Sequence, residues 1–428
     1  MNITGIIAEY NPFHNGHQYQ LEEARRLTNA DYLIVIMNGN FMQRGIPAYW
    51  NKYTRAAMAL RQGADAVIEL PVLYGTASAE FFALGGVRLL HQLGIVTHLC
   101  FGCETKDTEL LLSIADLLHR EPDAFRARLT QELARGNSFP KARARSILDS
   151  LESISVAYTE TEVEELLTKP NTILALEYLK ALMQTHSNIQ PVPCLRTDTG
   201  YHETHLSDGF SSATAIREVY AKQGCTSALQ NTVPPYVYEK LLHDFQNRSP
   251  IEMDAFYPLL QYSLWKPQHP LSDYLDVSTD MANRIQAVFR PEYNFSQLIE
   301  AIINKQYTYT RIYRSLLHIL LDIRKEELAA QLAGETMHYA RLLGFRKESS
   351  ALLKKLQEHS ELPLITRVAD SLRTMREQGN AAGARLLELD MSCSHLYEQT
   401  VVNQYGGSAI NEYTAGIIID DSSYDSVS

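Results

Sequence analysis

Two histidines near the start of the chain have a spacing that suits phosphate binding. They lie in Asn11-Pro-Phe-His-Asn-Gly-His17, after an apolar segment and before a stretch with helical periodicity. A helix N-terminus attracts anions, a glycine lets a ligand approach the backbone, and His14 and His17 can stabilise charge on phosphate oxygens. The alternative is a helix-capping loop with incidental histidines, and spacing alone does not decide between the two.

A second segment, Ser211-Ser-Ala-Thr-Ala-Ile-Arg217, places hydroxyl groups where a helix should begin. The hydroxyls of Ser211, Ser212 and Thr214, the first helical N–H groups and the Arg217 guanidinium could clamp the β and γ phosphates of a nucleotide. Taken alone, the segment is better interpreted as a serine-rich N-cap followed by a solvated arginine.

Apolar strands alternate with helical segments over the first hundred residues. Strands are predicted over residues 4–10, 31–37, 66–70 and 96–101, and helices over residues 18–28, 54–63 and 76–93. Strands joined by helical crossovers form a parallel sheet with helices on both faces, so the predicted fold class is α/β with a Rossmann-like, doubly wound sheet. Ligands bind such sheets beyond the carboxyl ends of the strands, and the loop with both histidines follows the first strand.

The remainder of the chain is predicted to be mainly helical. A strand is expected over residues 190–196, and a loop from Asp208 enters a helix near Arg217. The expected organisation is a nucleotide-binding domain over residues 1–225 with a helical insertion at about 105–187, a mainly α-helical domain over 226–413, and an acidic, loosely ordered tail over 414–428.

Length and composition are those of an ordinary globular protein. The 428 residues include 39 basic and 50 acidic side chains, giving a formal net charge of −11, with 45% hydrophobic residues. This length predicts two or three domains, and the composition excludes a disordered chain. The negative charge also excludes nucleic-acid binding by overall charge, so an RNA partner would need a local basic patch.

Cysteine usage and the amino terminus indicate a cytoplasmic protein. Five cysteines form no even disulfide framework, and Cys100-Phe-Gly-Cys103 lacks a second ligand pair for zinc, so we expect free thiols and no metal site of protein ligands. Glu9 interrupts the first apolar segment, which therefore does not resemble a signal peptide. No apolar stretch reaches the roughly 18 residues of a membrane span, so no membrane association is expected.

The two phosphate-binding segments occur in the order typical of the nucleotidyltransferase superfamily with the H-x-G-H motif, which the chain resembles. Members form adenylates from ATP and release pyrophosphate. The segment ending at Arg217 is similar to their second signature, with one alanine inserted.

Much of the chain, from about residue 3 to 350, resembles one family more closely, the tRNA(Met) cytidine acetate ligases. The segments that carry this resemblance are Gly39-Asn-Phe-Met-Gln-Arg-Gly45, Gly63-Ala-Asp-Ala-Val-Ile-Glu-Leu-Pro71, Ser78-Ala-Glu-Phe-Phe-Ala83, Pro170-Asn-Thr-Ile-Leu-Ala-Leu-Glu-Tyr-Leu179, Tyr307-Thr-Tyr-Thr-Arg-Ile-Tyr-Arg314 and Tyr339-Ala-Arg-Leu-Leu-Gly-Phe345.

The resemblance implies an enzyme that activates acetate with ATP and transfers the acetyl group to N4 of the wobble cytidine of elongator tRNA(Met). It implies catalytic roles for His14 and His17, with Mg²⁺ on the phosphates, and does not indicate an oligomeric state. The residues expected to bind ATP are Ile7, Ala8, Glu9, Tyr10, Asn11, Pro12, Phe13, Asn15, Gly16, Gln18, Tyr19, Gln20, Gly102, Asn171, Arg196, Ser211, Ser212, Thr214 and Arg217. From the residues alone, Asn171 is better interpreted as a helix cap, and Arg196 could pair with Asp198 instead of a phosphate.

A basic, tyrosine-rich segment is the candidate RNA-binding site. Lys305, Arg311 and Arg314 lie within a stretch from Ala301 to Leu321 that contains no acidic residue. Cations interleaved with aromatic rings suit phosphate contact and base stacking. The alternative is an ordinary solvated helix face with Tyr307 and Tyr313 packed in the core.

The chain departs from the family pattern at two positions. Ile46 and Asn51 stand where acidic residues are common, which could alter how the loop around Gln43 and Arg44 meets a substrate. Two other functions stay open: a small-molecule adenylyltransferase, disfavoured by the long helical extension, and a non-catalytic RNA-binding protein, disfavoured by the intact phosphate-binding segments.

Overall fold

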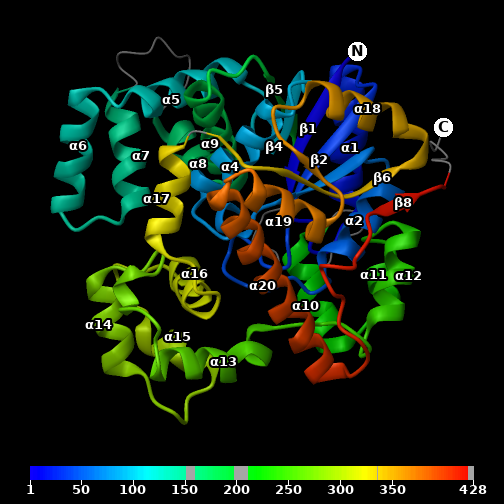
Figure 1. Cartoon of the computed structure of the whole chain (residues 1–428). Helices are drawn as coiled ribbons and strands as arrows, with labels where there is room; N and C mark the ends of the chain where they lie inside the picture. The colour runs from blue at the N-terminus through cyan, green and yellow to red at the C-terminus, as the bar shows by residue number, and fades with distance from the viewer. Residues whose placement is uncertain (151–159, 197–210, 335, 423–428) are drawn as a thin grey trace.

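The computed structural model describes residues 1–150, 160–196, 211–334 and 336–422 of the chain (Figure 1). Within these ranges the strands join into one sheet of eight strands, in the order β5-β4-β1-β2-β3-β6-β7 with β8 beside β6. The strands are β1 (Ile3–Ala8), β2 (Tyr32–Asn38), β3 (Ala66–Leu70), β4 (His98–Cys103), β5 (Gln190–Leu195), β6 (Ala340–Arg346), β7 (Leu364–Ile365) and β8 (Ile418–Asp420).

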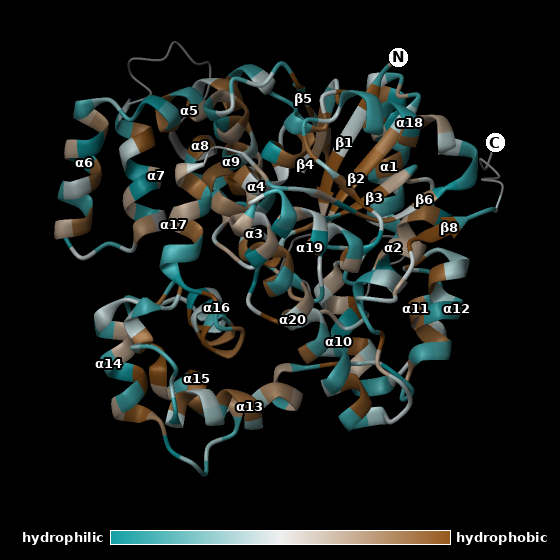
Figure 2. Cartoon of the chain, in the orientation of Figure 1, coloured by the Kyte–Doolittle hydropathy of each residue, from teal (hydrophilic) through white to brown (hydrophobic). Residues whose placement is uncertain are grey.

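The predicted doubly wound parallel sheet is confirmed. Strands β1 to β5 are parallel, and the order reverses at β1, which pairs with β2 on one side and β4 on the other. Alternate residues of β2 enter two cores: Ile34 and Ile36 face one, and Val35 and Met37 the other. Both faces of the sheet are therefore covered, and Figure 2 shows its strands as largely hydrophobic.

The helices of the first hundred residues follow the predicted pattern. They are α1 (Asn15–Thr28), α2 (Lys52–Arg61), α3 (Val72–Gly75) and α4 (Ala79–Gln92). Helix α4 lies very close to β1, since a Cβ on Gly86 would meet the Ile7 side chain at 2.6 Å and one on Gly5 would meet Leu90 at 2.6 Å. These glycines let the helix approach the strand that leads into the histidine loop.

Between β4 and β5 the described chain is helical, as expected. It forms α5 (Thr108–Arg120), α6 (Asp123–Ala134), α7 (Phe139–Ser150), α8 (Glu160–Thr168) and α9 (Pro170–Gln184). Helix α9 packs against α4 and α5, so it returns the chain to the sheet beside β4.

The second half is mainly helical, as predicted. Its helices are α10 (Ala213–Gln223), α11 (Ser227–Gln230), α12 (Pro235–Asp244), α13 (Met253–Trp265), η2 (Leu271–Asp273), α14 (Thr279–Val288), α15 (Phe295–Ile302), α16 (Tyr309–Leu320), α17 (Lys325–Ala333), η3 (Lys347–Ser349), α18 (Ser350–His359), α19 (Val368–Glu377) and α20 (Ala381–Tyr405). Helices α13 to α16 lie together, away from the sheet (Figure 1).

Two parts of the second half differ from the sequence-based expectation. Strand β6 lies antiparallel to β3 in the sheet, within the stretch expected to be helical. The expectation of a loosely ordered tail over residues 414–428 is wrong in part, because β8 pairs with β6. Glu412, just before this segment, is fully buried. Strand β6 contains two arginines, and Arg341 pairs with Glu69 and Arg346 with Asp65, both distant in the sequence, while Arg346 also pairs with nearby Glu348.

None of the helices in the described ranges is long and apolar enough to cross a membrane.

Candidate active site

A cavity of about 280 Å³ opens at the carboxyl ends of β1 and β4, where the strand order of the sheet reverses. This is the position at which doubly wound sheets bind ligands. The predicted site residues that line it are Ile7, Ala8, Glu9, Tyr10, Asn11, His14, Gly16, His17, Tyr19, Gln20, Gly102, Asn171, Arg196, Ser212, Thr214 and Arg217. The tertiary structure thus brings segments from β1, β4, α9, β5 and α10 to one place.

The histidine loop caps helix α1. His14 is the N-cap residue, and its Nδ1 accepts a hydrogen bond from the Gly16 N–H at 3.1 Å. The Nδ1 of His17 accepts from the His14 N–H at 3.3 Å, and the two rings stack with centroids 3.6 Å apart. Because both Nδ1 atoms accept, each neutral ring carries its proton on Nε2, where it can donate to a ligand. The Nδ1 atoms therefore serve helix capping, and the Nε2 atoms are left to bind phosphate. The two interpretations are compatible because they concern different nitrogens of the same rings.

Both imidazoles are neutral at physiological pH. Burial, with the guanidinium groups of Arg196 and Arg217, lowers the pKa of His14 to about 3. Burial, with His14 and Arg196, holds the pKa of His17 well below its ordinary value. The pair can thus stabilise anionic oxygens by hydrogen bonds, while the neighbouring arginines supply the positive charge.

Arg217 joins the two phosphate-binding segments. Its Nη1 donates to the Asn11 carbonyl at 2.6 Å, and its Nη2 donates to Thr214 Oγ1 at 3.2 Å. Ser212 is the N-cap of α10 and accepts from the Ala215 N–H at 3.1 Å. The serine-rich cap expected from the sequence is present, but the arginine is held against the histidine loop and is not a solvated side chain.

Asn171 and Arg196 form a second polar wall of the cavity. Arg196 Nη1 donates to Asn171 Oδ1 at 3.2 Å, and Asn171 Nδ2 donates to Glu104 Oε1 at 2.8 Å. The N-cap of α9 is Lys169, so the expectation that Asn171 caps a helix is wrong. A Cβ added at Gly102 would lie 3.5 Å from the Arg196 side-chain carbons, which is ordinary van der Waals contact, and Asp198 falls outside the described residues.

Five predicted ATP-binding residues are not part of the cavity lining: Pro12, Phe13, Asn15, Gln18 and Ser211. Phe13 is fully buried and packs against Tyr10, because it anchors the loop to the core. Asn15 binds the carbonyls of Asn231 and Thr232, and Gln18 donates to Glu22. These side chains shape the loop and do not face the cavity.

Several lining residues were not predicted. Gln43 and Arg44 enter from the loop after β2, and Phe82, Phe101, Leu174 and Tyr178 form an apolar wall. The segment from Gly39 to Gly45 was noticed in the sequence but had no assigned contact with ATP. The apolar wall had no sequence signal, because such side chains resemble ordinary core residues.

The described residues contain no group of three or more His, Cys, Asp or Glu side chains that could hold a metal ion.

The candidate RNA-binding residues surround the start of α16. Lys305 is exposed, and the Arg311 guanidinium lies 5.3 Å from the centre of the Tyr307 ring. Arg314 is largely buried and donates from Nε to Asp276 Oδ2 at 2.7 Å, so the pair serves the packing of α16. Tyr307 is buried, as the alternative interpretation held, whereas Tyr309 is half-exposed.

The two departures from the family pattern have structural roles. Asn51 is the N-cap of α2, and its Nδ2 donates to Glu398 Oε1 at 3.1 Å, a contact that an aspartate would turn into repulsion. Ile46 packs against the core.

Comparison with known proteins places the chain in a class. Residues 1–411 match the model of the HIGH nucleotidyl transferase family, and the chain belongs to this family. Among curated proteins it is similar to a tRNA(Met) cytidine acetate ligase from Halothermothrix orenii, 38% identical over 93% of this chain and 94% of that protein. The enzyme of that name from Acetivibrio thermocellus is 36% identical over 98% of this chain and its whole length.

Solved structures agree with this placement. The chain superposes on Thermotoga maritima TmcAL in its apo form with a TM-score of 0.91, at 30% identity, over 99% of this chain and all of that one. The same protein bound to alpha-thio ATP gives a TM-score of 0.89. Within the HIGH nucleotidyl transferases, the chain is a member of the tRNA(Met) cytidine acetate ligase family, as its sequence segments predicted.

Proposed function

We propose that this protein is an ATP-dependent ligase that forms acetyl-adenylate from acetate and then acetylates N4 of the wobble cytidine of elongator tRNA(Met). The observation that carries the proposal is the cavity, which is lined by the paired neutral imidazoles of His14 and His17 and by the side chains of Arg196 and Arg217. This arrangement suits a triphosphate whose charge must be neutralised without proton transfer.

In the first step an acetate oxygen attacks the α-phosphorus of ATP. A new P–O bond forms, the bond to the bridging oxygen of the β-phosphate breaks, and pyrophosphate leaves with the electron pair. The Nε2–H groups of His14 and His17 donate to phosphate oxygens on which charge develops. The step releases no proton, which fits imidazoles whose pKa values are too low for general acid catalysis at neutral pH.

In the second step the cytosine amine attacks the acetyl carbon. The C–N bond forms, the bond from the acetyl carbon to the AMP oxygen breaks, and the amine loses a proton to the departing phosphate or to water. Because the acyl group is already activated, no covalent enzyme intermediate is required. The apolar wall of Phe82, Phe101, Leu174 and Tyr178 provides a water-poor surface for the adenine ring or the acetyl methyl group.

The remaining partners follow from the same proposal. Mg²⁺ would enter bound to the phosphates of ATP and would neutralise part of their negative charge. The RNA contacts Lys305 and Arg311 at the exposed start of α16, near the loop that carries Gln43 and Arg44. A tRNA substrate places the protein in the cytoplasm.

The decisive experiment measures isotope exchange between ATP and pyrophosphate with and without acetate. We expect exchange that depends on acetate, and acetylation of elongator tRNA(Met) when the RNA is added. His17→Ala should lower the exchange rate by about 10² to 10³, because it removes a preorganised donor to the phosphates, while tRNA affinity stays unchanged.

Exchange that ignores acetate, or that needs a phosphorylated vitamin precursor, would instead identify a small-molecule adenylyltransferase. Tight tRNA binding without any exchange would identify a non-catalytic RNA-binding protein.

A further inference from the structure

The loop between β2 and α2, residues 39–51, carries two residues of the cavity and is called the pocket loop here. Gln43 and Arg44 line the cavity, and the Gln43 N–H donates to Glu9 Oε1 at 2.8 Å. Gly45 has a φ of +80° and lies directly on the backbone of Arg314. The path of the pocket loop therefore decides where Gln43 and Arg44 meet a nucleotide.

One face of helix α20 holds the pocket loop at three points. Asn40 Nδ2 donates to Ser394 Oγ at 3.0 Å, the Tyr397 hydroxyl donates to the Ala48 carbonyl at 2.9 Å, and Asn51 Nδ2 donates to Glu398 Oε1 at 3.1 Å. The α20 residues in these contacts are spaced three and four apart, so they share a face of the helix. All three are buried.

Beneath this face lies a charge-balanced cluster of buried ions. Lys52 Nζ lies 2.9 Å from Glu69 Oε1 and 3.1 Å from Glu412 Oε1, and its side chain is fully buried. Arg341 pairs with the same two carboxylates. The lysine and arginine thus match the two glutamates in charge, which a buried cluster requires.

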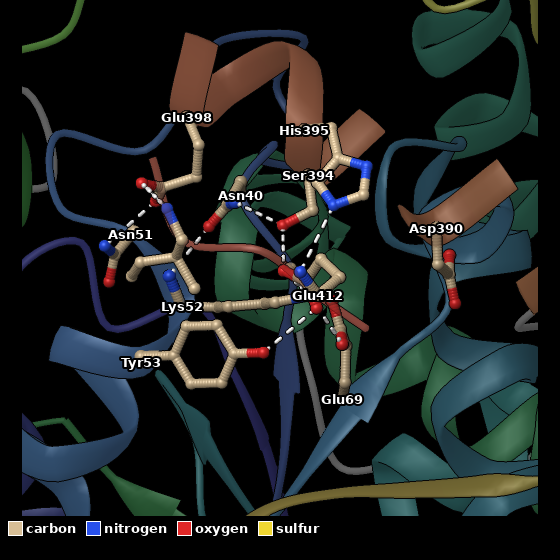
Figure 3. A network of polar contacts seen from close by, with 12 residues as sticks. Asn40, Asn51, Lys52, Tyr53, Glu69, Asp390, Ser394, His395, Glu398 and Glu412 are labelled. Carbon is tan, nitrogen blue, oxygen red and sulfur yellow. Dashed lines mark hydrogen bonds and ion pairs between the residues drawn. The ribbon is translucent and has the colours of Figure 1, made fainter. Parts of the chain in front are cut away.

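Ser394 connects this cluster to the pocket loop. Its hydroxyl donates to Glu412 Oε1 and accepts from Asn40 Nδ2, and Asn40 Oδ1 accepts from the Lys52 N–H at 2.7 Å. Figure 3 shows Asn40, Ser394 and Glu412 directed toward one another beside Lys52. Asn40 is three residues before Gln43 in the pocket loop, so its side-chain bonds are close in the chain to a residue of the cavity wall.

We propose that Ser394 and Glu412 are positioning residues of the ATP cavity, which act through Asn40 on the pocket loop and so set Gln43 and Arg44 against the nucleotide. The inference rests on the proposed use of this cavity for ATP. It makes the C-terminal part of the chain, remote from the phosphate-binding segments in sequence, a component of the nucleotide site.

Such a cluster contributes more to the position of the pocket loop than to the stability of the fold. Buried ion pairs often contribute little net stability relative to apolar residues of the same volume, because desolvation offsets their attraction. The paired members of a buried polar network, however, have few alternative arrangements, and this holds the attached loop in one of them.

The test uses Ser394→Ala in the full-length protein, with Ser392→Ala as the matched control. Ser392 lies on the same helix but is exposed, and its hydroxyl donates to the Glu388 carbonyl of its own helix. We expect Ser394→Ala to raise the dissociation constant for ATP, measured by calorimetry, by about five- to tenfold, because the buried hydrogen bond from Asn40 of the pocket loop is lost. Ser394→Thr should restore it to within about twofold, because the hydroxyl returns.

Hydrogen exchange provides a second readout on the same variants. The amides of Met42, Gln43 and Ala48 should exchange faster in Ser394→Ala than in Ser392→Ala, since their bonds to Ile46, Glu9 and Asn40 depend on the shape of the loop. Glu412→Gln should act in the same direction, whereas Glu388→Gln should not, because Glu388 is partly exposed and pairs with Arg376 of α19, away from the pocket loop.

An ATP dissociation constant within twofold of wild type in Ser394→Ala, or unchanged exchange of the loop amides, would overturn the proposal. A lower melting temperature with normal ATP affinity would mean that the cluster only stabilises the fold. ATP binding needs neither acetate nor tRNA, so these outcomes are distinct from a failure of the proposed ligase activity.

Discussion

His14 and His17 owe their chemistry to the atoms around them. Backbone N–H groups occupy the Nδ1 atom of each ring, which leaves Nε2–H as the donor toward the cavity. Burial and the nearby guanidinium groups of Arg196 and Arg217 keep His14 uncharged. The arginines thus supply the positive charge of the cavity, since they stay protonated at neutral pH, and the imidazoles supply directional hydrogen-bond donors.

A dependence of stability on pH follows from the low pKa of His14. In the unfolded chain this group binds a proton near pH 6.5, whereas in the folded protein it does so only near pH 3. Between these values the unfolded state holds more protons, so the free energy of unfolding falls as the pH falls, by about 1.4 kcal/mol per pH unit. His14→Asn removes this contribution. The free energies of unfolding of wild type and variant, measured by urea denaturation between pH 8 and 5 and plotted against pH, should therefore converge at low pH.

Parallel curves for the two proteins would show that His14 titrates normally in the fold. His318 is present in both proteins and cancels in the difference. His17 stacks on His14, which also lowers its pKa, so a change in the titration of His17 is part of the measured difference.

Beside the cavity, the pocket loop and helix α16 are in close backbone contact. The pocket loop reaches α16 at Gly45, where a Cβ would lie 2.3 Å from the Arg314 backbone nitrogen. This contact joins the cavity wall to the helix proposed to bind RNA, because Arg44, which lines the cavity, is adjacent to Gly45 in sequence. Only a glycine fits, since the site requires both a left-handed backbone and the absence of a side chain.

Gly45→Ala should therefore impair ATP binding more than its backbone strain alone explains. Gly136 is a matched control, with a φ of +81° and nothing within 4 Å of an added Cβ. We expect Gly136→Ala to lose about 1 to 2 kcal/mol of stability and no ATP affinity, whereas Gly45→Ala loses more stability and raises the KM for ATP. Thermal denaturation and exchange kinetics on both variants measure this, and equal effects would contradict the contact.

At the scale of the whole molecule, an acidic protein must bind an acidic polymer. With a net charge of −11, attraction to RNA has to come from a local patch, and the exposed start of α16 offers one. Helices α13 to α16 lie apart from the sheet (Figure 1), and α16 contacts the pocket loop at Gly45.

Lys305→Ala with Arg311→Ala should weaken tRNA binding without changing the exchange between ATP and pyrophosphate. The slope of log affinity against log salt should become flatter by about 1 to 2, as phosphate contacts are lost. Lys354→Ala with Arg373→Ala, which removes exposed cations from α18 and α19, is the control of equal charge. Filter binding at several salt concentrations makes the comparison, and equal weakening by both pairs would argue against a local patch.

The sequence by itself determined the parallel sheet, the loop of His14 and His17, and the helix that begins after Ser212. These depend on local signals: apolar strands, helical periodicity and capping residues act over a few positions. Most predicted cavity residues lie in these segments, and the resemblance of whole segments identified the family.

Only the tertiary structure decided the place of β6 and β8 in the sheet, the ion cluster of Glu412, and the cavity contacts of Gln43 and Arg44. Asn40 and Ser394 are separated by 354 residues, so their bond leaves no periodic trace in the sequence. A charged residue such as Glu412 looks solvent-exposed until its partners are known, because burial becomes favourable only when Lys52 and Arg341 arrive from distant elements.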